Sequence, residues 1–419
     1  MKAVVIGAGL QGVSTAYYLS KAGLEVTVLE QQATAGMETS FANGGILTPS
    51  MSDPWNAPGS WREMLLTMGQ EDSPLLIRPR ALPGMIGWGI GFLRNSSPAI
   101  FHRNTLNNFM LSHYSVQMMK EIRRESDISY DFMPSGTLKL FSDEVIFAKK
   151  LVQLAPLAAQ GLKFKPMTPA QIAKLEPMLA QGIDRIAGGV YFPDDESGDA
   201  HKFCQALMAE TKQRGVRYHF NSAVTSLEQQ NGRISAVCCG SAIHQADLFV
   251  LAAGCYSSGL LGKIRARVPI QPVKGYSLTF AGDGVKDMPR IPVVDDELHA
   301  ALVPLGKRFR IAGTAEFAGF DRTLSKGRVD NLRDVIARVY PSLLDNLQDK
   351  TGEAWTGFRP VSPDGVPLIG RLGAENLFIN AGHGHLGWTM AAGSARLLAD
   401  IMTGQEPEID SQAYRPGRF

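Results

Sequence analysis

The chain has 419 residues, 44% of them hydrophobic, and its 42 basic and 40 acidic residues leave a formal net charge of +2. This length suffices for about two or three domains, while the balanced charge excludes nucleic acid as an expected partner. The four cysteines, at 204, 238, 239 and 255, form no CxxC pair and no ligand spacing with histidine. We therefore expect no metal site and a reducing, cytoplasmic location. Because the first strand is predicted to begin at Lys2, no export signal is expected.

The first thirty residues predict a βαβ unit. A buried strand is expected over 2–6, a helix over 10–22 and a second strand over 25–29. The turn into the helix carries a Gly-x-Gly-x-x-Gly pattern, which permits a tight turn, close approach to a pyrophosphate and close helix–strand packing. The helix N-terminus favours the phosphates, and the acid after the second strand is placed to accept ribose hydroxyls, which disfavours NADP. We assign dinucleotide contacts here to Gly7, Gly9, Leu10, Gln11, Gly12, Glu30 and Gln31.

Residues 38–50, ETSFANGGILTPS, form a polar, glycine-rich loop where a simple dinucleotide-binding domain would continue with a helix. This loop is expected to wrap the cofactor through Ser40, Asn43, Gly44, Gly45 and Ile46. Amphipathic helices are predicted over 105–125 and 143–160, and another begins at the capping signature TPAQ, 168–171. The apolar segment 82–93, LPGMIGWGIGFL, is too short to span a bilayer. We interpret it as a buried or oligomer-contact helix, with an interfacial patch as the alternative.

The second half of the chain alternates between parallel and antiparallel patterns. Asp199 is expected to cap a helix that runs to Arg214, followed by a strand over 216–220, a hairpin at 231–232 and a buried strand over 247–252. Residues 268–317 alternate like an antiparallel sheet, and a helix over 328–339 ends at Pro341. We therefore predict an α/β, Rossmann-like cofactor domain made of 1–50, 186–262 and 350–405. It is interleaved with an α+β substrate domain on a mostly antiparallel sheet, made of 51–185 and 263–349, and 406–419 form a tail.

A second glycine loop near the C-terminus decides between NAD and FAD. The loop GHGHLGWT, 382–389, leads into a helix whose N-terminal amides would face the N1–C2=O edge of a flavin and stabilise its anionic reduced form. A nicotinamide-dependent dehydrogenase has no use for this second dipole, so FAD is the predicted cofactor. Its further contacts are assigned to Val224, Ala252, Ala253, Gly254, Gly382, His383, Gly384, Leu386, Gly387, Trp388 and Thr389.

Motifs that run in order from residue 1 to about 401 resemble the FAD-dependent D-amino-acid oxidase superfamily, most nearly the bacterial D-amino acid dehydrogenase small subunits. They are the N-terminal fingerprint, TSFANGGILTP, LAAGCYSS, PVKGYSLT, WTGFRPVSPDGVPLIGR and NAGHGHLGWTMAAGSARLLADI. The resemblance implies a glutathione-reductase-type FAD domain with non-covalent FAD. It also implies oxidation of a D-amino acid to an imino acid, which hydrolyses to a 2-oxo acid and ammonia. Electrons would pass to a respiratory acceptor such as a quinone at the inner face of the cytoplasmic membrane.

Hydride transfer from Cα–H to flavin N5 requires a clamped carboxylate, a neutral amine and a close approach, while the flavin carries the redox chemistry. Arg359 in TGFRP is the first candidate for the clamp, because a guanidinium binds a carboxylate through two parallel hydrogen bonds. The superfamily places its carboxylate-binding arginine in this motif. Tyr276 in VKGYS is expected to point toward the flavin and hydrogen-bond the substrate, with a core tyrosine as the alternative. His385 is predicted to alter pocket size or substrate choice, or else to be a structural donor.

Several further polar residues are weaker candidates. Lys274 is expected to be solvated or salt-bridged, and Arg308 and Arg310 to lie on a solvated strand face rather than to form a second clamp. Thr48 is a candidate for the pocket wall. The acidic run PDDESGD, 193–199, is interpreted as a solvated loop plus a helix cap.

Two alternative functions stay open at this point. One is an oxygen-using oxidase of the same fold that acts on glycine, sarcosine or D-amino acids. The other is a flavin-binding subunit of a larger complex. D-Alanine, D-proline-like imino acids and larger apolar D-residues all fit as substrates, and the sequence decides neither homo- or hetero-oligomerisation nor peripheral membrane association.

Overall fold

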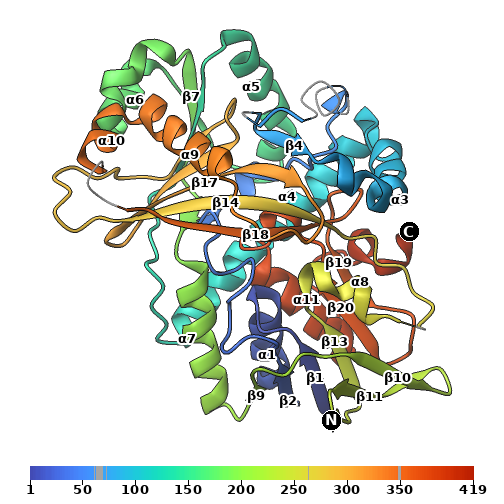
Figure 1. The fold of residues 1–419 in the computed structure, drawn as a ribbon. Coiled ribbons are helices and arrows are strands. Elements are labelled where there is room, and N and C mark those ends of the chain that lie inside the picture. The colour runs from blue at the N-terminus through green and yellow to red at the C-terminus, as the bar shows by residue number, and fades with distance from the viewer. Residues whose placement is uncertain (61, 63–68, 72, 263, 348–350) are drawn as a thin grey trace.

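The computed structural model describes residues 1–60, 62, 69–71, 73–262, 264–347 and 351–419, and these form two parts that are built on different sheets (Figure 1). The lower part in Figure 1 contains both the first and the last long helices, α1 and α11, side by side. The upper part contains a long, twisted sheet that is covered by helices. The α/β plus α+β organisation predicted from the sequence is therefore confirmed.

The lower part is built on a six-stranded sheet with the order β19-β20-β13-β1-β2-β9. All neighbours are parallel except β19 and β20. α1 packs against α7 and α11 on one face, and a three-stranded antiparallel sheet, β10-β11-β12, contributes to the core on the other. Because both faces are covered, the central strands are almost continuously apolar. The elements are β1 (Lys2–Ile6), α1 (Leu10–Lys21), β2 (Glu25–Leu29), α7 (Ala200–Gln213), β9 (Arg217–His219), β10 (Ser226–Gln230), β11 (Arg233–Cys239), β12 (Ala242–His244), β13 (Leu248–Leu251), α8 (Ser257–Leu260), β19 (Leu368–Arg371), β20 (Leu377–Ala381) and α11 (Ala391–Thr403).

The upper part is built on a mostly antiparallel sheet with the order β18-β14-β17-β16-β15-β5-β7-β6, in which β4 also pairs with β17. Helix α9 covers one face of β14 and β17. The strands are β4 (Leu75–Ile77), β5 (Thr137–Phe141), β6 (Lys165–Met167), β7 (Gly188–Phe192), β14 (Gln271–Ala281), β15 (Val293–Asp295), β16 (Ala300–Leu305), β17 (Arg308–Phe317) and β18 (Glu353–Val361). The helices are α3 (Leu82–Arg94), α5 (Glu144–Ala158), α6 (Pro169–Leu175), α9 (Lys326–Val339) and α10 (Pro341–Leu347). Helix α4 (Pro98–Glu125) packs on α11 instead, and most of its buried apolar side chains join the core of the lower part.

Two strands lie in a different sheet from the one that their sequence segments suggest. β7 and β18 belong to segments assigned above to the cofactor domain, but both pair within the upper sheet. Local composition predicts that a segment is a strand and does not determine which sheet it joins. β18 therefore carries Arg359 into the upper sheet, although the rest of the C-terminal region belongs to the lower one.

Most of the acidic run 193–199 is buried rather than solvated, and Asp194 is its exposed member. Asp199 caps α7 through Lys202 N at 3.0 Å and accepts a second hydrogen bond from Arg308 at 2.6 Å. Glu196 pairs with Arg123 at 2.9 Å, and burial raises the pKa of Asp195 to about 8. The predicted cap is confirmed, whereas the predicted solvated loop holds only at Asp194, because β8 (Glu196–Ser197) pairs with β3 (Ile46–Leu47) inside the molecule.

Candidate active site

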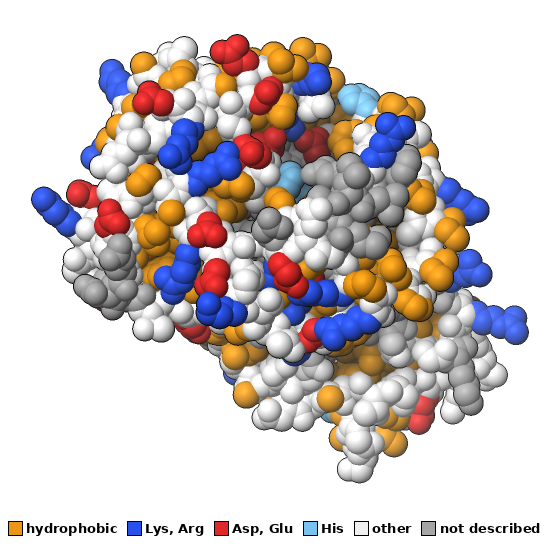
Figure 2. All heavy atoms as spheres, turned by 45° about the horizontal axis from the view of Figure 1, so that its top comes forward, with side chains coloured by type: hydrophobic (Ala, Val, Ile, Leu, Met, Phe, Trp, Pro, Cys, Tyr) orange, Lys and Arg blue, Asp and Glu red, His pale blue; other side chains and the backbone are white. Residues whose placement is uncertain are grey.

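A cavity of about 1090 Å³ lies between the two parts and takes residues from both. The face drawn in Figure 2 is hollowed, with acidic side chains and a histidine around the hollow. Small-molecule sites usually measure about 300–1,000 Å³, so this cavity has room for a large cofactor together with a small substrate.

The first glycine turn forms one end of this cavity. Gly7 has φ +103°, and a Cβ there would lie 2.7 Å from Ala252 O; a Cβ at Gly12 would lie 1.8 Å from Gly7 O. The Glu30 carboxylate accepts hydrogen bonds from Ala8 N at 2.6 Å and Gln32 N at 2.9 Å, while burial raises its pKa. The carboxylate is thus fixed beside the turn, where an acid would meet the ribose of a dinucleotide.

The second glycine loop faces the first and is joined to it. Gln11 Nε2 donates to Gly387 O at 2.8 Å, and Gln11 Oε1 accepts from Ser394 Oγ at 3.1 Å. Gly384 to Leu386 form a single 3-10 turn, and α11 begins at Ala391, directly after the predicted loop. The two ends of the site are therefore held together by one side-chain amide.

Most of the predicted cofactor residues line the cavity. Four do not, because they pack behind its wall: Gly12 against Gly7 O, Gly382 against Leu368, Leu386 in the core, and Thr389, whose Oγ1 accepts from Thr48 N at 3.0 Å. The residues that do line it are Gly7, Gly9, Leu10, Gln11, Glu30, Gln31, Ser40, Asn43, Gly44, Gly45, Ile46, Val224, Ala252, Ala253, Gly254, His383, Gly384, Gly387 and Trp388. Thr48 also lines it.

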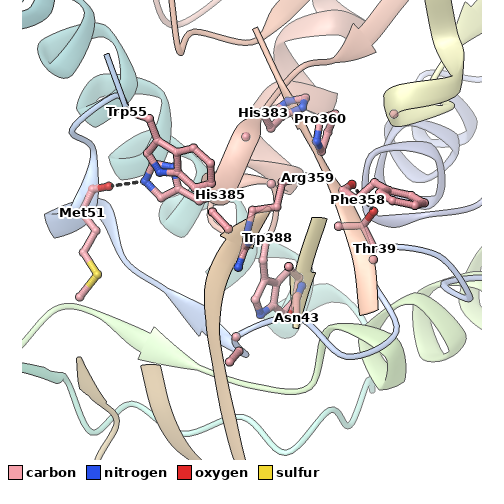
Figure 3. Close-up of a pocket in the computed structure, with 18 of the residues that line it drawn as sticks. Thr39, Asn43, Met51, Trp55, Phe358, Arg359, Pro360, His383, His385 and Trp388 are labelled. Atoms are coloured by element: carbon pink, nitrogen blue, oxygen red, sulfur yellow. Dashed lines mark hydrogen bonds between the residues drawn. The ribbon is translucent and has the colours of Figure 1, made fainter. Parts of the chain in front are cut away.

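Arg359 stands in the middle of the cavity wall (Figure 3). Its Nη1 donates to Thr314 O at 2.9 Å, and its guanidinium lies 5.8 Å from the centre of the Trp55 ring. Burial lowers the pKa of Arg359 to about 10. Within the described part of the chain no carboxylate pairs with it, so this cation is suited to receive an anionic ligand.

Two glycines leave space for Arg359 and Trp355 on the surface of the sheet. Gly275 and Gly357 are directly opposite each other on β14 and β18. A Cβ at Gly275 would lie 2.3 Å from Arg359 Nη1, and one at Gly357 would lie 2.1 Å from the Trp355 ring. Neither was among the predicted site residues, although a glycine inside a strand is a signal for close approach.

Tyr276 does not point toward Arg359. Its hydroxyl donates to Glu316 Oε2 at 2.6 Å, and its ring belongs to the core beneath α9. Successive residues of a strand point to opposite faces, and Gly275 is the residue that faces Arg359. The Tyr276 hydroxyl is therefore engaged by Glu316 and its ring packs in the core, as the alternative predicted, although Tyr276 also forms part of the cavity lining. Lys274 is buried as well, and its Nζ donates to Thr323 O at 2.5 Å.

Arg308 and Arg310 provide no second clamp in this arrangement. Arg308 pairs with Asp131 and Asp199. Arg310 is buried, contrary to the expected solvated face, and donates to Asn43 O at 3.1 Å and Thr279 Oγ1 at 2.9 Å. Arg310 therefore supports the loop around Asn43 from behind.

The two histidines of the second loop occupy different surroundings. His383 is buried, and its backbone forms an isolated β-bridge with Val361. Neither of its ring nitrogens has a hydrogen-bond partner among the described residues. His385 stacks on Trp55 at 5.7 Å, and its Nε2 lies 3.1 Å from Met51 O. Burial lowers the pKa of His383 to about 3 and that of His385 to about 4. Both rings are therefore neutral near pH 7, and the unpartnered nitrogens of His383 fit a polar cofactor.

A glycine-lined dinucleotide site beside a partly buried arginine defines a dinucleotide-dependent oxidoreductase. The sequence profile of the DAO family, FAD dependent oxidoreductase, matches residues 2–401, and the chain belongs to this family. A D-amino acid dehydrogenase from Paramagnetospirillum magneticum is 40% identical over 100% of this chain and 99% of that protein. A D-amino acid dehydrogenase from Vibrio vulnificus is 38% identical over 97% of each chain.

Solved structures show the same fold at lower identity. L-Proline dehydrogenase from P. horikoshii superposes with a TM-score of 0.79, 20% identity, and coverage of 100% of this chain and 97% of that chain. Glycine oxidase from Geobacillus kaustophilus has a TM-score of 0.78 at 20% identity, with coverage of 100% of this chain and 98% of that chain. At this identity the likeness concerns the fold alone.

Proposed function

We propose that the chain is an FAD-dependent D-amino acid dehydrogenase, which oxidises a D-amino acid such as D-alanine or a D-proline-like compound. The imino acid formed would hydrolyse to a 2-oxo acid and ammonia. The observation that carries the proposal is the partly buried Arg359, which lines the cavity without a carboxylate partner among the described residues and whose missing counter-charge the substrate carboxylate would supply. Removing a cation from water without such a partner is costly. The names of the relatives at 37–40% identity support the same reaction.

The side chains around Arg359 would position the substrate. Thr314 O engages Nη1 and leaves other guanidinium N–H groups for the carboxylate. A carbonyl oxygen only accepts, so the ring of His385 donates from Nε2 to Met51 O and keeps Nδ1 as an acceptor. This neutral ring accepts from the substrate amine without a positive charge that would repel it. FAD, when bound, supplies the two-electron acceptor.

Anaerobic mixing with enantiomers tests the proposal. D-Alanine and D-proline are expected to bleach the flavin absorbance of the purified holoenzyme, and L-alanine is not. A chain that retains FAD and is bleached by no D-amino acid would instead be a flavin-binding subunit. Rapid peroxide formation when the reduced enzyme meets air would make it an oxidase of the same fold.

Non-covalent attachment of FAD is part of the proposal. Cys255, which lies near the cavity, is buried, and its thiol donates to Phe358 O at 3.6 Å. Burial raises the pKa of this thiol well above its ordinary value, which keeps it un-ionised and unreactive. Acid precipitation is expected to leave all yellow colour in the supernatant; colour in the pellet would contradict this.

The electron acceptor is proposed to be a quinone reached at a membrane surface. No helix in the described residues is long and apolar enough to cross a membrane. α3 instead packs Met85, Trp88 and Phe92 inward and exposes a stripe of four apolar side chains, of which Ile86 is 65% exposed. The helix contains no acidic residue and ends at Arg94. An apolar stripe beside basic residues suits an anionic lipid surface.

Phe92 of α3 and Phe101 of α4 both line the cavity, so a membrane-bound α3 would bring a lipid-soluble acceptor close to it. The full chain is expected to sediment with vesicles that contain phosphatidylglycerol, and Ile86→Asp to weaken this about tenfold or more. Ile243→Asp, at a 62% exposed site on β12, is the matched control. Equal binding by both variants would remove α3 from the proposal.

A further inference from the structure

Four charged side chains form two ion pairs along the cavity wall. Lys150 of α5 pairs with Asp53, and Lys139 of β5 pairs with Asp296. The charges of both lysines act on Asp53, so the two pairs are neighbours. All four residues line the cavity that also contains Arg359. We call these four residues the Lys–Asp ladder.

The ladder is placed close to the site where the substrate is proposed to bind. Asp53 stands two residues before Trp55, whose ring contacts both Arg359 and His385. The charges of Arg359, Asp53 and Lys139 all act on the His385 ring. A carboxylate held on Arg359 would therefore leave the rest of a small amino acid within reach of the ladder.

The ladder retains hydrogen-bonding capacity that the protein does not use. The lysine side chains are 9% and 14% exposed, and each has one carboxylate partner among the described residues although an ammonium has three N–H donors. Asp53 and Asp296 are 35% and 28% exposed, and Asp53 Oδ1 has only a long contact of 3.5 Å with Thr105. Ion pairs that leave water are stable when their remaining donors and acceptors are occupied. The unused groups face the cavity, so its contents must occupy them.

We propose that the Lys–Asp ladder binds the side chain of the substrate and selects D-amino acids with a neutral hydrogen-bonding group, a carboxamide or a hydroxyl. This inference rests on the proposed D-amino acid oxidation. Two lysines and two aspartates sum to zero charge, so a charged side chain would bring an uncompensated charge. An apolar side chain would leave the unused donors and acceptors of the ladder without hydrogen-bond partners. Sites built from polar groups reject analogues that lack the matching group.

Sets of substrates with the same shape test the selection. D-Asparagine, D-leucine and D-aspartate have side chains of similar size, as do D-glutamine, D-methionine and D-glutamate. In stopped-flow reduction of the holoenzyme, we expect kcat/KM for the amide to exceed those of the apolar and the acidic partner by about tenfold or more in at least one set. D-Leucine and D-methionine equal to or better than the amides would overturn the inference. D-Alanine is the reference: if it and every other D-amino acid fail, the proposed function fails instead.

Variants of the ladder locate the selection. Lys150→Met is expected to lower the ratio of kcat/KM for the amide to that for its apolar partner about tenfold, and Asp53→Asn to lower it in the same direction. Lys163→Met is the matched control, because Lys163 pairs with Asp194 at 3.0 Å on the surface, where both are half or more exposed. A structural role alone would reduce all substrates by the same factor. An unchanged ratio in Lys150→Met that retains FAD would overturn the inference.

Discussion

The two halves of the cavity, which we propose bind the cofactor and the substrate, are built by different means. The cofactor half is made of backbone and glycines: the turn from Gly7 to Gly12, the loop around Asn43, and the second loop from Gly382. The substrate half is made of side chains, namely Arg359, Trp55, His385 and the Lys–Asp ladder. Backbone groups bind the parts that all dinucleotides share, whereas charged side chains discriminate among small substrates. Changes in the first half should therefore affect cofactor retention, and changes in the second should affect the choice and rate of substrate oxidation.

The largest effect is expected from closing the glycine turn of the cofactor half. Gly12→Ala would place a Cβ 1.8 Å from Gly7 O, so the turn must open. We expect the purified variant to lose its yellow colour and all activity, measured by the ratio of absorbance at flavin and protein wavelengths. Gly84→Ala is the control, because this helical glycine has free space around it. A yellow, fully active Gly12→Ala would contradict the assignment of this turn.

Substitution of Arg359 should impair the substrate half of the cavity and leave the cofactor half intact. Arg359→Ala is expected to lower kcat/KM about 10²- to 10³-fold, since losing one partner of a buried charge pair costs about 2–5 kcal/mol. FAD should stay bound, and Arg359→Lys should recover only part of the rate because a lysine cannot bind a carboxylate through a fork. Arg371→Ala, at an exposed arginine of β19, is the control. Near-normal kcat/KM in Arg359→Ala would place the carboxylate elsewhere.

A smaller change tests the same clamp through its neighbour. Gly275→Ala would put a methyl group 2.3 Å from Arg359 Nη1 and push the guanidinium aside. We expect kcat/KM to fall about tenfold to a hundredfold, because a misplacement of about 1 Å costs up to about 10². Stopped-flow reduction by D-alanine measures this. Gly327→Ala on α9, where a methyl group meets nothing, should keep the normal rate.

The smallest effect concerns the pH dependence of stability. The pKa of His383 is about 3 in the folded chain, below its ordinary value of 6.5, because its side chain is buried. The unfolded state thus binds the extra proton first, so the wild type loses stability as pH falls from 6.5 toward 3. His383→Gln lacks this titrating group, and the Tm difference between variant and wild type should shift in the variant's favour by a few degrees over that range. A difference that is constant with pH would mean that the pKa of His383 is the same in the folded and the unfolded state.

The sequence predicted the cofactor half well because its signals are local. The strand, turn and helix of residues 2–21 and the acid at 30 lie within thirty residues, and β1, α1 and β2 were found close to their predicted bounds. Arg359 was found through a resemblance to a family motif. The face of the sheet on which Arg359 lies was not predictable from composition. Neighbouring residues of a strand point to opposite faces, and Gly275, not Tyr276, faces Arg359.

The Lys–Asp ladder of the substrate half was missed because its residues come from distant segments. Asp53, Lys139, Lys150 and Asp296 lie on a loop, a strand, a helix and a strand end, and only the tertiary fold brings them together. The ion pairs of Asp199 with Arg308 and of Glu196 with Arg123 likewise join residues far apart in the chain. For this reason most of an acidic run that looked solvated proved to be buried.

The amide of Gln11 has a consequence for how the enzyme is made. It reaches from the first helix to Gly387 and Ser394, and β20 lies between β13 and β19 within the lower sheet. The binding site for the vitamin-derived ligand is therefore incomplete in a nascent chain on the ribosome. It is completed only when nearly the whole polypeptide has emerged. Riboflavin supply would then act on completed chains, and truncation after residue 380 would yield a product that no added flavin can rescue.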